Sequence, residues 1–387
     1  MHLKNKSTIR YVIFIAVFAG ILVIPAFLTC IYKITGKSFD RELKGNYDAV
    51  YKPEFSAEKL VNGELTGDIE SYVHNTFQGR GIFITTYNQI KHSVFNENSS
   101  DYIGKDLVSD GYIKASLGID ELDESNPENS TSMKEFVSRL VEINNELNNR
   151  GKQLIVMRAL NKADYLSENI PRRYYLMKNK DSIGAGVFFD SLMKESGVPY
   201  FNTKEFVDEL DMEYPIFYKS SHHWSRPVEA QVENRLFEIV EEVSGSKMER
   251  YSFSDVIAVD FPLDRDGDVL DLINIWTDTN EMYYRYVVEP DIPDEPVNIC
   301  IQGDSFTTLI CQDMVTNGHN GVVTNIFYDE MLYEGDFNTQ QLNHDFSNVD
   351  FDYLVNNNDV FVICYTDNNL CFYGYGYTEA LLSYLKG

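Results

Sequence analysis

Two segments of this 387-residue sequence have the residue types that nucleophilic chemistry needs, and the first contains Ser305. The run Ile301-Gln302-Gly303-Asp304-Ser305-Phe306 reads as an apolar strand that enters a turn, with a helix starting near Thr307. A serine at such a junction faces outward, where backbone N–H groups and the helix dipole stabilise an oxyanion. Gly303 leaves the backbone room for the sharp turn. Asp304 and Ser305 also suit a helix N-cap, so the triplet alone fits a purely structural role as well.

The second segment is Phe217-Tyr218-Lys219-Ser220-Ser221-His222-His223-Trp224-Ser225, just before an expected amphipathic helix. Histidine is the usual base for a serine nucleophile because its pKa lies near neutrality. A pair of histidines in a loop also fits a packing or surface role. Because no acidic or histidine partner stands at a familiar ligand spacing from His222 and His223, we expect no metal.

The rest of the chain supplies elements that can position these segments. Apolar residues recur at helical spacing from Met133 to Leu147, Gly151 ends the helix, and residues 153–157 follow as a buried strand. A second helix is expected at 183–196, and further strands are expected at 297–301, 322–327 and 360–365. Short apolar strands alternating with amphipathic helices predict a three-layer α/β/α domain with a mainly parallel sheet.

Residues 11–32, near the amino terminus, form a long apolar segment without a charge between Arg10 and Lys33. It is long enough to cross a bilayer as a helix. We expect an uncleaved single transmembrane helix, with a cleaved signal peptide or a buried core helix as the alternatives. The expected plan is a cytoplasmic tail (1–10), the anchor (11–32), a spacer and lead-in (33–110) and the α/β domain (111–387). Basic residues flank the span on both sides, so charge alone does not orient it.

Composition excludes some partners. The formal charge of −27 lies mostly downstream of the apolar segment, and it argues against nucleic acid and against tight binding of any polyanion. The five cysteines form no compact disulfide pattern.

Taken together and in this order, the two motifs resemble a known family. FYKSSHHWS is similar to the signature of the DHHW family, and IQGDSF is similar to the nucleophile block of the same proteins. These belong with the alginate O-acetyltransferase accessory proteins, whose SGNH hydrolase domain is circularly permuted. The resemblance implies an SGNH-like domain in which Ser305 is the nucleophile, His223 its general base, and Trp224 a packing neighbour. The family's orienting Asp stands two residues before that His, where this sequence has Ser221.

The resemblance also implies a function. It suggests a membrane-anchored, extracytoplasmic O-acyl (acetyl) transferase or esterase that modifies a polysaccharide or cell-envelope glycan and cooperates with a membrane-bound O-acyltransferase. The N–H of Ser305, supported by Gly303 and Asp304, is the expected oxyanion donor, and no organic cofactor is implied. Because a hydroxyl at Ser221 cannot stabilise an imidazolium as a carboxylate does, two possibilities stay open. Another carboxylate or a carbonyl replaces the Asp, or the chain is a catalytically degenerate glycan-binding or assembly subunit.

Overall fold

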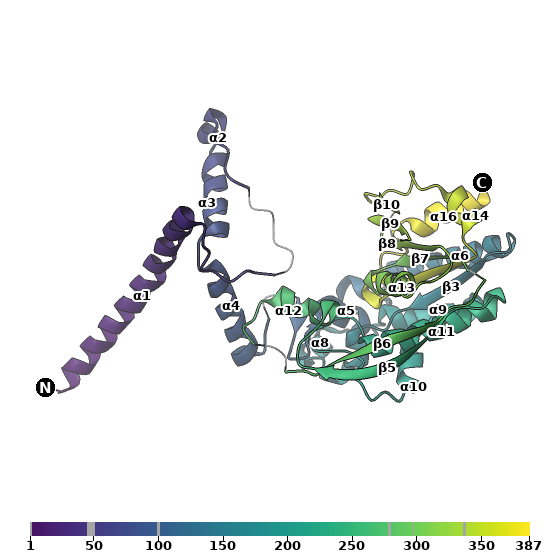
Figure 1. Ribbon diagram of the computed structural model, residues 1–387, viewed down its shortest axis with the longest axis horizontal. Helices are drawn as coiled ribbons and strands as arrows, with labels where there is room; N and C mark the ends of the chain where they lie inside the picture. Colours follow the sequence, from purple (N-terminus) through teal and green to yellow (C-terminus); the bar gives the residue numbers. More distant parts are fainter. Residues whose placement is uncertain (1, 45–50, 99–100, 278–279, 296, 336–337) are drawn as a thin grey trace. The chain divides into compact units, whose positions relative to one another are not determined.

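The computed structural model describes residues 2–44, 51–98, 101–277, 280–295, 297–335 and 338–387 (Figure 1). The chain divides into two compact units. One comprises residues 1–100 together with 269–278, and the other comprises 101–268 together with 279–387. The segments around His223 and Ser305 both belong to the second unit.

A seven-stranded sheet forms the centre of the second unit, with the strand order β10-β9-β8-β7-β11-β3-β4. Neighbouring strands from β8 to β4 pair in parallel, and β9 and β10 extend one edge in antiparallel fashion. The predicted mainly parallel sheet is therefore confirmed. The strands are β3 (Gln153–Arg158), β4 (Tyr200–Asn202), β7 (Ile299–Gly303), β8 (Val323–Phe327), β9 (Met331–Glu334), β10 (Asn338–Gln341) and β11 (Val360–Tyr365).

Alternate side chains of each strand point to opposite faces of the sheet. Both faces carry apolar side chains, and helices cover both of them. Leu154 and Val156 of β3 join one buried cluster, whereas Ile155 and Met157 join the other. The first cluster packs under α6 (Pro127–Asn148), α9 (Ala185–Ser196), α14 (Phe351–Asn357) and α16 (Tyr377–Lys386). The second packs under α10 (Thr203–Glu209), α11 (Arg226–Ser244) and α13 (Ser305–Thr316). This confirms the predicted three-layer α/β/α architecture.

Shorter elements complete the second unit. A two-stranded ribbon pairs β5 (Arg250–Val259) with β6 (Tyr283–Asp291), and a small hairpin pairs β1 (Tyr102–Ile103) with β2 (Val108–Ser109). A third buried cluster lies around α5 (Asp110–Leu117), with α7 (Lys162–Tyr165) and α8 (Arg172–Met177) packed beside it. A short helix, α15 (Asp367–Leu370), follows β11.

The parallel register brings the carboxyl ends of the central strands to one edge of the sheet, where ligand sites of open α/β sheets usually lie. At this edge Arg158, at the end of β3, is buried and ion-paired. Its guanidinium lies 2.7 Å from Asp367, which follows β11, 2.9 Å from Asp164 and 2.9 Å from Asp190. Buried charges are stable only when paired in this way, so this network ties the loops after β3 and β11 together.

The first unit consists of helices. Its elements are α1 (His2–Thr35), α2 (Ala57–Asn62), α3 (Glu64–Thr76), α4 (Arg80–Ile90), a π-helical turn (Lys91–Phe95), and the part of α12 (Asp268–Ile273) that follows Asp268. Within α1, residues Thr8–Thr35 are long and apolar enough to cross a membrane, by length and composition. A signal sequence meets the same criteria.

One buried feature links α11 to α13. Glu229 and Glu233 of α11 and Asp313 of α13 place carboxylate oxygens within 4.8 Å of one another. Arg265 pairs with Glu229 at 2.9 Å, but neither oxygen of Glu233 has a hydrogen-bond partner among the described residues. Burial, and then the neighbouring Glu229, raise the pKa of Glu233 well above its ordinary value.

The raised pKa predicts a pH-dependent effect of Glu233→Gln. A carboxyl whose pKa is higher in the folded than in the unfolded state contributes stability when protonated, and this contribution is lost as the pH rises through its folded pKa. Glutamine never ionises, so we expect the thermal midpoint of the variant to exceed that of the wild type by about 2–4 °C near pH 8.5, the change that about 1 kcal/mol produces. Near pH 5 the difference should shrink. Glu238→Gln, on the exposed side of the same helix, is the matched control, and an equal shift at both pH values would contradict the interpretation.

Candidate active site

Ser305 stands where the sequence predicts it, at the first position of α13 directly after β7. Gly303 is needed here for space. A Cβ at this position would lie 2.1 Å from the carbonyl oxygen of Cys364 and 2.6 Å from a methyl carbon of Thr307. Any side chain would therefore push β7 away from β11 and displace the serine.

Asp304 is the N-cap of α13 and accepts a hydrogen bond from the N–H of Phe306 at 3.1 Å. Its other oxygen accepts from the N–H and hydroxyl of Thr366 and from the Asn369 amide, each at 2.8 Å. Burial raises the pKa of Asp304. Asp304 thus connects the end of β7 to the loop after β11, and its role is to position the serine rather than to orient His223.

The histidine segment is a tight loop before α11. An isolated bridge pairs Phe217 with Trp224, and the residues between them form the loop tip. The buried ammonium of Lys162 donates to three backbone carbonyls of this tip, those of Tyr218 (2.8 Å), Lys219 (3.0 Å) and Ser221 (2.8 Å). Because three backbone acceptors converge on one amine, Lys162 sets the shape of the loop.

The two segments meet through a chain of hydrogen bonds. The Ser305 Oγ lies 2.8 Å from Nε2 of His223, and the Nδ1 of the same ring lies 2.9 Å from Oδ2 of Asp268. All three residues belong to the second unit. A hydroxyl, an imidazole and a carboxylate in this order form the arrangement by which a serine is activated as a nucleophile.

Ser221, at the position of the family Asp, has a different contact. Its hydroxyl accepts a hydrogen bond from the backbone N–H of His223 at 3.1 Å and lies 3.4 Å from the carbonyl of the same residue. Ser221 stands at the position of the family Asp, but its hydroxyl contacts the backbone of His223 and so shapes the loop. The carboxylate behind the ring is Asp268, 45 residues further along the chain.

The loop before Asp268 is attached to the histidine segment. Ser220 donates its hydroxyl to the carbonyl of Asp266 at 2.5 Å, and its N–H donates to Glu281 at 3.1 Å. The N–H of His222 also donates to Oδ1 of Asp268 at 3.3 Å. These contacts hold Asp268 in line with the imidazole of His223.

The protonation state of His223 suits a general base. Burial, and then the Arg265 guanidinium, lower the pKa of this imidazole below its ordinary value, so the resting ring is neutral. A neutral ring accepts a proton at Nε2, while its Nδ1–H donates to Asp268. The carboxylate then stabilises the imidazolium that forms when Ser305 reacts.

His222 contributes to the same polar group without facing Ser305. Its Nδ1 lies 3.2 Å from Asp268 and 3.4 Å from the hydroxyl of Tyr102. Its ring also contacts Tyr112 edge-on. His222 therefore supports the position of Asp268 through its ring and its backbone N–H.

Aromatic residues surround the serine. Trp224 is buried and packs edge-on against Phe306, so it is a packing neighbour as the resemblance implies. The phenol of Tyr328, just after β8, interacts with the backbone N–H and hydroxyl of Ser305 and with Asn369. The N–H of Ser305 and the phenol of Tyr328 are thus the candidate donors to an oxyanion.

Among the residues that the structure describes, two groups of side chains have the spacing of metal ligands. His222, His223 and Asp268 form one, and Glu229, Glu233 and Asp313 form the other. In the first group both Nδ1 atoms face the same carboxylate oxygen, so a cation there would replace the hydrogen bond that orients His223. The Ser–His–Asp chain requires no such ion.

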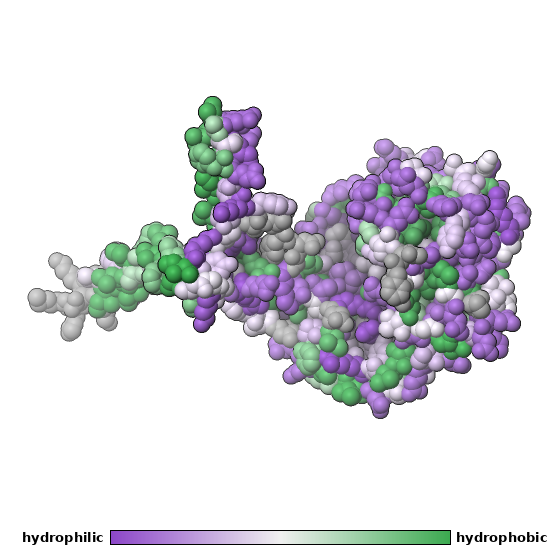
Figure 2. Space-filling model, turned by 45° about the horizontal axis from the view of Figure 1, so that its top comes forward, coloured by the Kyte–Doolittle hydropathy of each residue, from purple (hydrophilic) through white to green (hydrophobic). Residues whose placement is uncertain are grey.

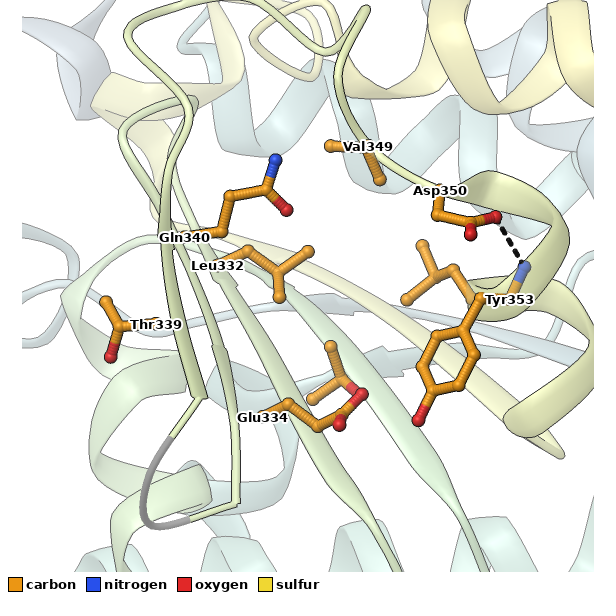
Figure 3. A pocket seen from close by; sticks show the side chains of 9 residues that line it. Leu332, Glu334, Thr339, Gln340, Val349, Asp350 and Tyr353 are labelled. Atoms are coloured by element: carbon orange, nitrogen blue, oxygen red, sulfur yellow. Dashed lines mark hydrogen bonds between the residues drawn. The ribbon is translucent and has the colours of Figure 1, made fainter.

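A separate pocket lies between the β9–β10 edge of the sheet and the start of α14 (Figure 3). Asp350 caps α14 there by accepting from the N–H of Tyr353 at 2.9 Å. The lining includes neither Ser305 nor His223, and it pairs no nucleophile with a base. The lining residues are Thr324, Leu332, Glu334, Thr339, Gln340, Val349, Asp350, Tyr353 and Leu354.

Sequence reasoning missed Asp268 and Tyr328. Asp268 ends an acidic run, Asp264-Arg265-Asp266-Gly267-Asp268, which looks like any exposed loop. No fixed spacing connects it to His223, and only the folded chain brings the two together. Tyr328 follows a buried strand whose carboxyl end reaches the same edge as that of β7, and this adjacency was the one available signal.

Comparisons with known proteins give structural neighbours only. No protein-family model and no curated protein sequence matches this chain. Among solved structures, the O-acetyltransferase domain of Pseudomonas putida AlgJ is 12% identical with a TM-score of 0.44, over 74% of this chain and 98% of the other. Bacillus cereus PatB1 is 11% identical with a TM-score of 0.41, over 62% and 90%. A DHHW family protein from Eubacterium siraeum is 10% identical with a TM-score of 0.38, over 64% and 88%.

An O-acetyltransferase domain and a DHHW family protein are thus among the solved structures that resemble this chain. At identities of 10–12% and TM-scores of 0.38–0.44, these likenesses carry no conclusion about what this chain does. Function is therefore inferred from the side chains of this chain alone.

Replacement of Asp268 tests the hydrogen-bond chain. We expect Asp268→Asn to lower the rate at which Ser305 takes an acyl group from an activated ester by up to about 10⁴-fold, because an amide stabilises the wrong tautomer and cannot balance the imidazolium. Ser221→Ala, which removes only a contact to the backbone, should cost far less. The measurement is acylation of the full-length protein in detergent, followed by intact mass. A larger loss in Ser221→Ala than in Asp268→Asn would contradict the assignment.

The lowered pKa of His223 predicts the pH dependence of the same reaction. A base with the ordinary histidine pKa of 6.5 would lose about three quarters of its neutral form by about pH 6. Because burial lowers this pKa, we expect the acylation rate to stay nearly constant from about pH 8 to about pH 6 and to fall only in more acidic buffer. The rate measured with Ser305→Ala is subtracted as background. If the acylation rate instead falls with a midpoint near pH 6.5, burial does not lower the pKa of His223.

Proposed function

We propose that this chain is an extracytoplasmic O-acyltransferase or esterase that works through an acyl-serine at Ser305. The observation that supports it is the chain of hydrogen bonds from Ser305 through His223 to Asp268, with distances of 2.8 and 2.9 Å, at the amino end of α13. Asp268 provides the carboxylate that the sequence lacks at Ser221. The alternative of a catalytically degenerate binding subunit therefore loses its main support.

The reaction has two halves. In the first, Ser305 Oγ attacks the carbonyl carbon of an acyl ester while its proton passes to Nε2 of His223. The oxyanion accepts hydrogen bonds from the Ser305 N–H and the Tyr328 phenol. The donor alcohol then leaves with the proton from His223, and the acyl group stays on the serine.

In the second half, an acceptor O–H gives its proton to Nε2 of His223 while its oxygen attacks the carbonyl carbon of the acyl-serine. The bond from that carbon to Ser305 Oγ then breaks, His223 returns the proton to Oγ, and the acyl group leaves on the acceptor. A sugar hydroxyl as acceptor makes the protein a transferase, and water makes it an esterase. The proposed acceptor is a polysaccharide or cell-envelope glycan, as the family resemblance implies. The formal charge of −27 disfavours a strongly anionic polymer.

The proposed setting is the outer face of a membrane. In this arrangement α1 is the anchor, residues 1–10 lie in the cytoplasm, and the second unit lies outside. A membrane-bound O-acyltransferase is the proposed source of acyl groups, because an extracytoplasmic enzyme has no direct access to cytoplasmic acyl donors.

The first test is formation of the acyl-enzyme. Full-length protein is incubated with an activated acetyl ester such as p-nitrophenyl acetate, and intact mass should show one acetyl group that is absent from Ser305→Ala. Addition of neutral oligosaccharides should then speed loss of the adduct and yield an acetylated sugar. A folded protein that never forms the Ser305 adduct would disprove the enzyme and favour a binding or assembly role. An adduct that only water removes would identify an esterase.

A further inference from the structure

The outward side of α4 is apolar, which is the reverse of the usual pattern for a helix in a water-soluble protein. Phe83, Tyr87, Ile90 and Val94 recur at helical spacing from α4 into the π-helical turn, and they are 40%, 60%, 50% and 70% exposed. Apolar side chains thus occupy solvent-exposed positions of α4 in the first unit.

The inward side of α4 is small and polar. Its buried residues are Gly81, Thr85 and Asn88. The Asn88 amide donates to the carbonyl of Ile273 at 2.7 Å, and a Cβ on Gly81 would lie 1.9 Å from the carbonyl oxygen of Arg41. The helix therefore packs on its own unit through polar and close backbone contacts, and the apolar stripe faces away from them.

The preceding helix α3 has a similar surface. Ile69 and Val73, one turn apart, are 47% and 56% exposed, whereas Ser71 points to the opposite, polar side. In Figure 2 the column formed by α2 and α3 is green along one side and purple along the other. The successive helices α3 and α4 thus each have exposed apolar side chains on one side.

The corner between α3 and α4 contacts α1 inside its apolar span. The N–H of Gln78 donates to the hydroxyl of Thr29 at 2.8 Å, and a Cβ on Gly79 would lie 3.8 Å from the ring of Pro25. Thr29 comes three residues before Tyr32, the last residue of the uncharged run, which is about 4.5 Å along a helix axis. Helices in a membrane interface bury their apolar sides to about this depth.

We propose that the apolar sides of α3 and α4 lie in the interface of the lipid bilayer beside α1, as a second membrane contact. This rests on the anchoring by α1 that the proposed function includes. Two further features favour lipid as the occupant. Lys33 donates to the phenol of Tyr72 at 2.9 Å, a pair of residue types common at membrane interfaces. Residues 1–100 contain 11 Lys and Arg against 9 Asp and Glu, so this part of the chain lacks the negative charge that an anionic surface would repel.

Spin-label accessibility tests this in the full-length protein. Single cysteines at Tyr87→Cys and Val73→Cys are introduced into a background without the two more accessible native thiols, Cys30→Ser and Cys371→Ser, since the other three cysteines are buried. The labelled protein is reconstituted into vesicles of phosphatidylcholine and phosphatidylglycerol. Collision with oxygen, which concentrates in lipid, is compared with collision with a water-soluble nickel chelate. Ser71→Cys on the polar side of α3 is the matched control.

We expect the oxygen-to-nickel ratio at positions 73 and 87 to exceed that at position 71 by about threefold or more, because an apolar collider partitions into hydrocarbon. Equal ratios at all three positions would show that the stripe faces water. Low accessibility to both colliders would show that protein, such as a second copy, covers it. Either result overturns the proposal. A separate protein that keeps Cys30 and carries only Cys371→Ser is labelled at Cys30, and this label reports whether α1 itself is in lipid. Acylation of Ser305 is also measured separately, so failure of this proposal is distinguishable from failure of the anchor or of the enzyme.

Discussion

The candidate site depends on how Phe306 packs between the two segments that carry it. Phe306 follows the nucleophile directly and is fully buried, and its ring centroid lies 4.7 Å from that of His223 and 4.7 Å from that of Trp224. The first turn of α13 is thereby pressed against the loop that leads into α11. Because α11 and α13 pack on the same face of the sheet, the start of α13 and the loop before α11 lie side by side, and Ser305 and His223 are within hydrogen-bond distance.

Around this apolar contact, buried polar groups determine the finer geometry. Lys162 holds the tip of the histidine loop through three carbonyls, Asp304 joins the end of β7 to the loop after β11, and Arg158 joins that loop to the end of β3. Each of these groups would be costly to bury without its partners. Because each of these buried groups has its partners, the site is held in its geometry before a substrate binds. Preorganisation of this kind stabilises a developing oxyanion.

The two units differ in chemistry as well as in position along the chain. The second unit carries the negative charge and a core packed on both sides of its sheet, as expected for a body in water. The first unit is nearly balanced in charge and exposes apolar side chains on α1, α3 and α4. Such a division agrees with the proposal that the first unit contacts a membrane.

The sequence by itself determined the layers, the parallel sheet and the Ser305 and His223 segments, since apolar periodicity and strand-to-helix turns are local patterns that neighbouring residues encode. It also identified the apolar segment of α1. Only the tertiary structure decided which carboxylate stands behind the imidazole. Asp268 and His223 are 45 residues apart, and Tyr328 reaches Ser305 only because β8 pairs with β7. Contacts of this kind depend on strand register and loop path rather than on spacing. The sequence therefore showed that Ser221 replaces the family Asp, but it could not point to Asp268 as the carboxylate beside His223.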